Sequence, residues 1–247
     1  MKRVGVIEVI SRAEQGRTQP YLCRCDDGHS YYVKGRSANR RGLAAEVICA
    51  QLATALDLPV PEAVIAEVPD ELIEASKAAG ISLDELGPGP CFGSQVVQAV
   101  EFTMSHKSEV TPLLKQSLAV FDWWTRNEDR TLTAFGGNVN LLWRLDADGG
   151  LVVIDHNLAF SEFSPQRFLD THVFADTLVQ VAEDMHAQTD WSLRLGGVLA
   201  GWDSMCSSIP SEWNYIDVEQ TVPSDINLEA TKALLDRCEF DGFWNLK

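Results

Sequence analysis

The sequence predicts an α+β protein in which most strands precede most helices. The first hundred residues contain short segments where β-branched and aromatic residues alternate with polar ones, as in half-buried strands. After Phe102 the pattern becomes mainly helical, and all seven Trp lie between Trp123 and Trp244. This change of composition predicts two lobes, residues 1–101 and residues 102–247, each with a core of its own.

Three strands are expected at the start of the chain, in "RVGVIEVI", "YLCRC" and "SYYVK". The last two, residues 21–25 and 30–34, flank the turn dipeptide Asp27-Gly28, so they are predicted to pair antiparallel. Cys23 and Cys25 are two residues apart on one strand and therefore share a face. We interpret the six Cys as reduced thiols acting as small apolar residues, because no zinc-type spacing links them.

A buried helix is predicted from Gly42 to Asp57, because "GLAAEVICAQLATALD" is apolar on nearly every side. The segment "LPVP" ends it, since proline cannot continue a helix. Two more strands follow, "EAVIAEVP" and "CFGSQVVQAVEF", separated by an acidic surface helix and its tail over residues 70–86. The expected first lobe is therefore an antiparallel sheet with one buried helix.

The second lobe is expected to begin with a helix, "TPLLKQSLAVFDWWTRN". The stretch "NVNLLWRLDADGGLVVIDH" predicts a β-hairpin with its turn near Asp148-Gly149-Gly150. From Arg167 onward the pattern is mostly helical. This lobe is therefore predicted to combine one hairpin with a helical core.

The total charge limits the partners of the chain. Its net charge of −16 at pH 7 repels phosphates, which disfavours direct binding to nucleic acid. No segment reaches the roughly 18 apolar residues of a membrane span, and the start lacks the apolar core of a signal peptide. We therefore expect a cytoplasmic protein without a membrane segment, in a reducing compartment.

One acidic side chain interrupts the buried helix. Glu46 is the only charged residue between Gly42 and Leu56. A carboxylate on such a helix is costly to bury unless a cation meets it, and Lys34 on the preceding strand is the partner we expect. The alternative is an exposed helix face. A strand lysine held by a helix glutamate is how kinase-like sites direct an ammonium to nucleotide phosphates.

A second group of polar residues surrounds the predicted hairpin. Asp129 lies in the loop before it, Asn140 begins its first strand and Asp155 ends its second. The antiparallel strands bring Asn140 and Asp155 close, and an amide oxygen with a carboxylate suits Mg²⁺. Asp129 can accept or orient a hydroxyl proton. Together with Lys34 and Glu46, these residues match the parts needed for phosphoryl transfer, although "FGGNVN" alone is equally typical of an ordinary turn.

In these residues the sequence resembles the HipA-like kinases, of the smaller class that lacks the long N-terminal extension of the HipA toxins. The segments that carry the resemblance follow the order of the family over roughly residues 17–160: "YYVKG", "AAEVICAQLATALDLPVPE", "RNEDRT", "GGNVNLLW" and "LVVIDHNLAF". The last ninety residues or so share only their helical character. The resemblance implies a bilobal protein-kinase-like fold, with a β-rich N-lobe and a mainly helical C-lobe, that binds ATP and Mg²⁺.

The resemblance also implies roles for single residues. Lys34 would contact the ATP phosphates, Glu46 would orient Lys34, and Asp129 would be the catalytic base. Asn140 and Asp155 would hold magnesium. Kinases commonly place this asparagine five residues after the aspartate, whereas here "TLTAFGG" intervenes, so Asn138 is an alternative ligand to Asn140.

Two backbone segments complete the implied nucleotide site. The hinge offering bonds to adenine would be Val100, Glu101, Phe102 and Thr103. The loop from Ser11 to Thr18, with Gly16 as its one glycine, would cover the phosphates; a plain surface loop is the alternative.

The resemblance extends to partners. Characterised toxin members phosphorylate protein Ser or Thr, notably on aminoacyl-tRNA synthetases, which implies such a translation protein as substrate and an antitoxin or other regulator as partner. Two alternatives stay open. The acceptor is a small molecule in the first, and in the second the chain is a non-catalytic module that binds nucleotide or a partner protein.

Overall fold

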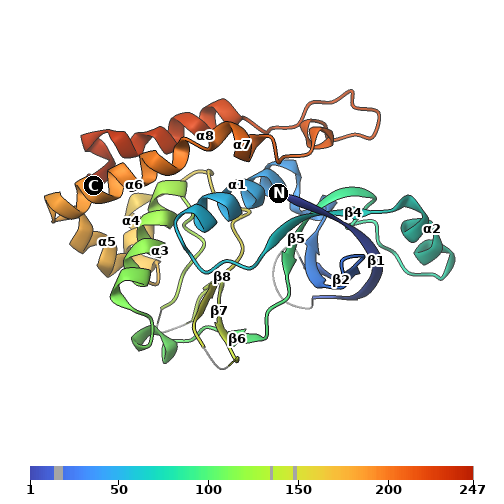
Figure 1. The fold of residues 1–247 in the computed structure, drawn as a ribbon, viewed down its shortest axis with the longest axis horizontal. Coiled ribbons are helices and arrows are strands. Elements are labelled where there is room, and N and C mark those ends of the chain that lie inside the picture. Colours follow the sequence, from blue (N-terminus) through green and yellow to red (C-terminus); the bar gives the residue numbers. More distant parts are fainter. Residues whose placement is uncertain (14–18, 134–135, 147–148, 247) are drawn as a thin grey trace. The chain divides into compact units, whose positions relative to one another are not determined.

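The computed structural model describes residues 1–13, 19–133, 136–146 and 149–246. The fold is α+β, as predicted, with its barrel strands in the first part of the chain and most helices in the second (Figure 1).

The chain divides into two compact units. The first consists of Met1–Val47, Pro61–Val97 and Ser207–Ile226, and the second of Ile48–Val60, Gln98–Cys206 and Asn227–Lys247. Each unit therefore combines segments that are far apart along the chain.

Five strands of the first unit close into a barrel. They are β1 (Lys2–Arg12), β2 (Tyr21–Cys25), β3 (Ser30–Lys34), β4 (Ala63–Val68) and β5 (Gly89–Gln95), in the order β1-β2-β3-β5-β4. Strands β2 and β3 pair antiparallel as predicted, with Gly28 at φ 84° in the turn. Strands β1 and β4 pair in parallel, which differs from the expected antiparallel sheet. This one parallel ladder joins the two outer strands and closes the barrel.

The barrel interior is apolar and includes three cysteines. Cys23, Cys25 and Cys91 belong to the same buried cluster as Val6 and Val33. Burial raises the pKa of the Cys23 and Cys91 thiols to about 12, so both stay protonated at neutral pH. All six cysteines of the chain are free thiols, and five of them are buried, which confirms their interpretation as small apolar residues.

The predicted strand "CFGSQVVQAVEF" is two strands in different sheets. The barrel strand β5 ends at Gln95, whose N–H donates to the carbonyl of Glu62 at 2.9 Å. Strand β6 (Ala99–Glu101) belongs to the second unit, where the N–H of Leu145 donates to the carbonyl of Gln98 at 2.9 Å. The expectation of one strand was wrong because the local pattern stays β-like across the break.

The two predicted helices of the first hundred residues are present. They are α1 (Arg40–Ala55), which starts slightly earlier than predicted, and α2 (Asp70–Ala78). The boundary between the units falls inside α1, between Val47 and Ile48.

The second unit contains a small antiparallel sheet and most of the helices (Figure 1). Strands β7 (Leu141–Arg144) and β8 (Leu151–Val153) form the predicted hairpin, and β6 pairs with the outer side of β7. Asp148 of the predicted turn lies outside the described residues. The N-cap of helix α3 (Pro112–Thr125) is Thr111, whose Oγ1 accepts the N–H of Leu114 at 3.3 Å. The helices that follow are α4 (Pro165–Thr171), α5 (Ala175–Ala182), α6 (Met185–Leu199), α7 (Trp202–Cys206) and α8 (Leu228–Leu235).

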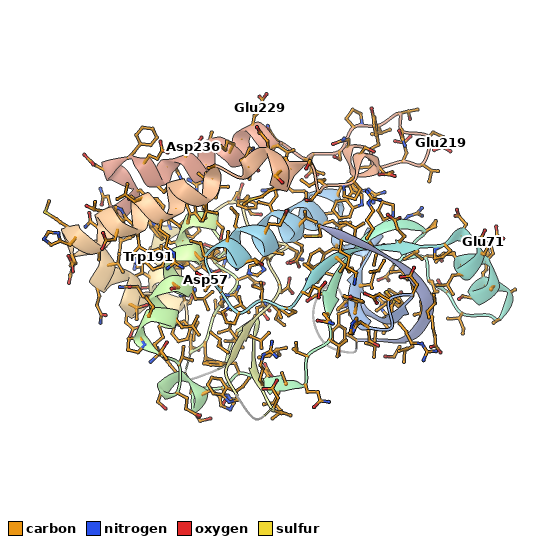
Figure 2. The ribbon with its side chains drawn as sticks, viewed as in Figure 1. Asp57, Glu71, Trp191, Glu219, Glu229 and Asp236 are labelled. Atoms are coloured by element: carbon orange, nitrogen blue, oxygen red, sulfur yellow. The ribbon has the colours of Figure 1, made fainter. Side chains whose placement is uncertain are left out.

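The last turn of α1 is fixed within the second unit by an arginine of α6. Arg194 donates to the carbonyl of Leu56 at 2.7 Å and to the carboxylate of Asp57 at 3.2 Å, and its guanidinium lies 5.1 Å from the ring centroid of Trp191. Figure 2 labels Asp57 and Trp191. In the part of the chain that the structure describes, no helix combines the length and the apolar content needed to cross a membrane.

Candidate functional site

Lys34 and Glu46 form a buried ion pair in the first unit. The Nζ of Lys34 lies 2.5 Å from Oε1 of Glu46, and the two side chains are 10% and 3% exposed. Lys34 is the last residue of β3, and Glu46 lies on α1. The expected partnership is therefore confirmed, and the alternative of an exposed Glu46 is excluded.

Ser11, predicted to belong to a phosphate-covering loop, is part of strand β1. It pairs with Leu22, and its neighbour Arg12 pairs with Tyr21. Strand β1 extends beyond the apolar segment that predicted it. The reason is that β2 pairs with β1 along the whole length of β2, from Cys25 back to Tyr21. Gly16 lies outside the described residues, so a phosphate-covering loop there stays a prediction.

The predicted hinge coincides with β6, the edge strand of the small sheet. The N–H of Phe102 donates to the carbonyl of Leu141 at 3.0 Å. Because hydrogen-bonded pairs alternate along an antiparallel ladder, Val100 faces β7 with its backbone groups, while the backbone N–H and C=O of Glu101 point away from it. Among the hinge residues, Glu101 therefore presents its backbone at the open edge of the sheet.

A histidine, His106, binds the backbone of the last hinge residue, Thr103. The N–H of Thr103 donates to Nδ1 of His106 at 3.1 Å, and the N–H of His106 donates back to the carbonyl of Thr103 at 3.0 Å. The imidazole stacks on Trp143 with ring centroids 5.1 Å apart, and Phe102 is buried beside both rings. These contacts already engage the backbone groups of Thr103.

Asp129 meets both candidate asparagines in the second unit. The amide Nδ2 of Asn138 donates to Oδ2 of Asp129 at 2.8 Å. The amide Nδ2 of Asn140 donates to the same oxygen at 3.2 Å and to the backbone carbonyl of Asp129 at 3.1 Å. Three of the predicted site residues are thus in direct contact.

A short excursion of the chain explains the long spacing between Asp129 and the asparagines. The N–H of Thr131 donates to the carbonyl of Asn138 at 2.8 Å, and the N–H of Asn138 donates to Oγ1 of Thr131 at 3.1 Å. The N–H of Thr133 donates to the carbonyl of Gly136 at 3.0 Å. The chain therefore leaves and returns to the same place, which brings Asn138 back to Asp129.

Gly137 is essential to this return. A Cβ atom on Gly137 would lie 2.3 Å from the backbone oxygen of Thr131, a separation that two such atoms cannot adopt without a backbone shift. We expect Gly137→Ala to destabilise the protein by about 1–3 kcal/mol, as overpacking does, and to displace Asn138 from Asp129. Urea unfolding measures the first effect. Gly197→Ala is the control, because a Cβ there meets nothing within 4 Å and alanine favours the helix; equal losses in both variants would contradict the prediction.

Asp155 directly follows the strand pair that carries Asn140. The N–H of Ile154 donates to the carbonyl of Asn140 at 3.2 Å, so the residue before Asp155 lies opposite Asn140. Both Asn140 (φ 48°) and Asp155 (φ 60°) have left-handed backbone, which Asn and Asp tolerate better than most residues. The neighbouring His156 is buried, with its ring 5.7 Å from that of Phe121. The hairpin thus places Asn140 and Asp155 at adjoining strand ends, as predicted.

A buried polar network that the sequence reasoning missed lies behind this loop. Asp122 of α3 is fully buried, and its Oδ2 accepts from Nε of Arg130 at 2.7 Å and contacts Nε2 of His172 at 2.9 Å. Its Oδ1 accepts from Nδ2 of Asn127 at 2.9 Å. Burial alone would raise the pKa of the Asp122 carboxyl, but Arg130 and His172 outweigh it and lower the pKa to about 2.

His172 is a neutral hydrogen-bond donor in this network. Its Nδ1 accepts the N–H of Phe174 at 3.2 Å, so the ring proton is on Nε2 and is donated to Asp122. Burial lowers the pKa of His172 below its ordinary value of 6.5, against the opposing effect of Asp122. The backbone beside it also holds the loop, because the N–H of Val173 donates to the carbonyl of Arg130 at 3.1 Å.

Acid is expected to destabilise the second unit in two steps. The pKa of His172 is lower in the folded chain than in the unfolded chain, so below about pH 6.5 the unfolded chain binds a proton more readily at this residue. The free energy of unfolding therefore falls as the pH drops below about 6.5. The contribution of Asp122, about 2 kcal/mol, is lost as the pH falls from about 3.8 toward about 2. Urea unfolding at several pH values measures both steps. His172→Gln should remove the first step and His186→Gln, at an exposed position of α6, should keep it; the reverse pattern would refute the assignment.

The predicted site residues carry the chemical groups that Mg²⁺ and nucleotide phosphates require. Asn140 and Asp155 supply amide and carboxylate oxygens, the hard donors that Mg²⁺ prefers. Lys34 supplies an ammonium whose position Glu46 fixes, which suits a phosphate.

Comparisons with known proteins identify the family of the chain. None of the curated proteins compared with the chain matches it. The family model described as HipA-like kinase matches residues 6–247, nearly the whole length. The chain therefore belongs to the HipA-like kinase family.

Proposed function

We propose that this chain is an ATP- and Mg²⁺-dependent phosphotransferase with a bilobal kinase-like fold, acting on Ser or Thr hydroxyls of a protein. The observation that carries the proposal is the buried pair of Lys34 on a strand and Glu46 on a helix. This arrangement directs an ammonium to nucleotide phosphates. The family to which the chain belongs supports the same activity.

The proposed chemistry is in-line transfer of the γ-phosphoryl group. Lys34 binds phosphate oxygens, and the carboxylate of Asp129 orients the acceptor hydroxyl and accepts its proton. The acceptor oxygen forms a bond to the γ-phosphorus as the bond to the β–γ bridging oxygen breaks, which releases ADP. The backbone of Glu101 is the proposed partner of adenine.

Asn140 and Asp155 are the proposed metal ligands. Bound Mg²⁺ would offset the charge of the phosphates. We assign Asn140 rather than Asn138 because the carbonyl of Asn140 pairs with the residue before Asp155. Asn138 then serves Asp129 through its 2.8 Å hydrogen bond.

Incubation with γ-labelled ATP and Mg²⁺, with and without a cell extract, tests the proposal. Label on Ser or Thr of a protein is the expected result. Label on a metabolite would move the acceptor to a small molecule. Nucleotide binding without any transfer would identify a non-catalytic module. A Lys34→Met variant and an Asp155→Asn variant should each lose transfer, because Lys34 is the proposed phosphate ligand and Asp155 is a proposed metal ligand.

A further inference from the structure

Arg130 is a fully buried arginine that directly follows Asp129. Its Nε donates to Asp122 on α3 at 2.7 Å. Its Nη1 donates to two backbone carbonyls, that of Asn140 at 2.5 Å and that of Ile154 at 3.2 Å. A single guanidinium therefore joins a helix, the start of β7 and the end of β8.

These contacts link Arg130 to each proposed catalytic residue of the second unit, either directly or through its neighbour in the chain. Asn140 is a contact of Arg130 through its own carbonyl, Ile154 precedes Asp155, and Asp129 precedes Arg130 itself. We propose that Arg130 is a positioning residue, which sets the base Asp129 and the metal ligands Asn140 and Asp155 relative to one another. This inference rests on the proposed function and deepens it.

The anchor of Arg130 is itself immobilised. Asp122 receives hydrogen bonds from Asn127 and His172 as well as from Arg130, and all four residues are buried. Because its carboxylate is held on both oxygens, Asp122 fixes the plane of the guanidinium, and with it the direction of Nη1.

A purely stabilising role does not account for this arrangement. A buried ion pair stabilises a fold no better than apolar side chains of the same volume usually do. Apolar side chains, however, could not bind the carbonyls of Asn140 and Ile154. The planar guanidinium has five N–H donors in a rigid fork, whereas a lysine ammonium is a single point charge. Arg130→Lys therefore keeps the charge that Asp122 needs and loses the simultaneous hold on both strand ends.

The experiment measures metal binding as well as transfer in Arg130→Lys. Mn²⁺ binding is followed by electron paramagnetic resonance in the presence of a non-hydrolysable ATP analogue, and transfer is followed over a range of Mg²⁺ concentrations. We expect Mn²⁺ binding to weaken by about 10–100-fold, as removal of residues that orient metal ligands usually does. The Mg²⁺ concentration for half-maximal transfer should rise in parallel, with metal-free nucleotide binding unchanged.

Arg167→Lys is the matched control. Arg167 is exposed and donates at 3.2 Å to Glu128, the residue before Asp129. Its replacement should alter Mn²⁺ binding by less than about 2-fold, as expected of a surface ion pair. Asp122→Asn is the second variant, because asparagine has nearly the same size as aspartate and removes only the negative charge that holds Arg130. All values are expressed per folded molecule, measured by tryptophan fluorescence at low temperature.

The outcomes separate this inference from the proposed function. Weaker Mn²⁺ binding in both variants supports the positioning role even if the wild-type chain transfers no phosphate, in which case the proposed activity alone fails. Mn²⁺ binding and Mg²⁺ dependence that stay within about 2-fold of the wild-type values, as in the control, would overturn the positioning role.

Discussion

Replacement of Asp129 by asparagine is expected to lower the rate of phosphoryl transfer by about 10²–10⁴-fold, the range that a positioned general base contributes. Asparagine keeps an oxygen that can accept the hydrogen bond now made by Asn138, so the loop should keep its shape. The amide cannot take the proton of the acceptor hydroxyl. The loss should therefore appear in kcat, while the KM for ATP changes little.

The measurement for Asp129→Asn is label transfer at saturating ATP and Mg²⁺, together with the rise in Tm that nucleotide causes. The rise in Tm should persist, because Asp129 is not assigned to nucleotide binding. Asp146→Asn makes the same chemical change at an exposed aspartate that pairs with Arg144, and its rate should equal that of the unchanged protein. Label transfer that survives in Asp129→Asn would show that the base is a different residue.

Local sequence patterns predicted the elements of this fold better than their assembly. The turn at Asp27-Gly28 and the strands β7 and β8 depend on neighbouring residues, and the structure has them as predicted. Closure of the barrel depends on parallel pairing between Lys2–Gly5 and Val64–Glu67, which are far apart in the chain. No local pattern encodes such a pairing. The same limit explains why the break between β5 and β6 escaped prediction.

The polar residues of the site likewise divide into those that a local pattern predicts and those that only the fold brings together. Glu46 was found because a lone carboxylate on an apolar helix requires a cation. Asp122 carries the same signal, since it stands between Phe121 and Trp123 in an apolar helix. Its partners Arg130 and His172 could not be chosen from the sequence, because the fold alone brings residue 172 back to α3.

The spacing of Asn138 and Asn140 illustrates a third case. The distance along the chain from Asp129 is larger than in most kinases, which made the choice between the two ambiguous. Thr131 and Asn138 hydrogen-bond to each other across the extra residues, so both asparagines lie beside Asp129 in spite of the longer spacing. Sequence spacing is therefore a poor guide wherever an insertion can fold back on itself.

Removal of Glu46 is expected to have the largest effect on stability. Glu46→Ala removes the carboxylate that pairs with the buried ammonium of Lys34, and breaking a buried pair in this way costs about 3–5 kcal/mol. Urea unfolding gives the change in the free energy of unfolding. Glu67→Ala is the control in the same unit, because Glu67 pairs with Arg3 on the exposed outside of the barrel and should cost at most about 1 kcal/mol.

A double variant separates the structural role of the pair from its chemical role. Lys34→Met combined with Glu46→Leu removes both charges, so most of the stability lost in Glu46→Ala should return, because apolar residues of similar volume replace a buried ion pair well. Phosphoryl transfer should not return, since no ammonium remains to bind the phosphates. A stable double variant that still transfers phosphate would show that Lys34 and Glu46 serve the fold alone. A double variant as unstable as Glu46→Ala would show that the cost lies in packing around α1 and not in the loss of the ion pair.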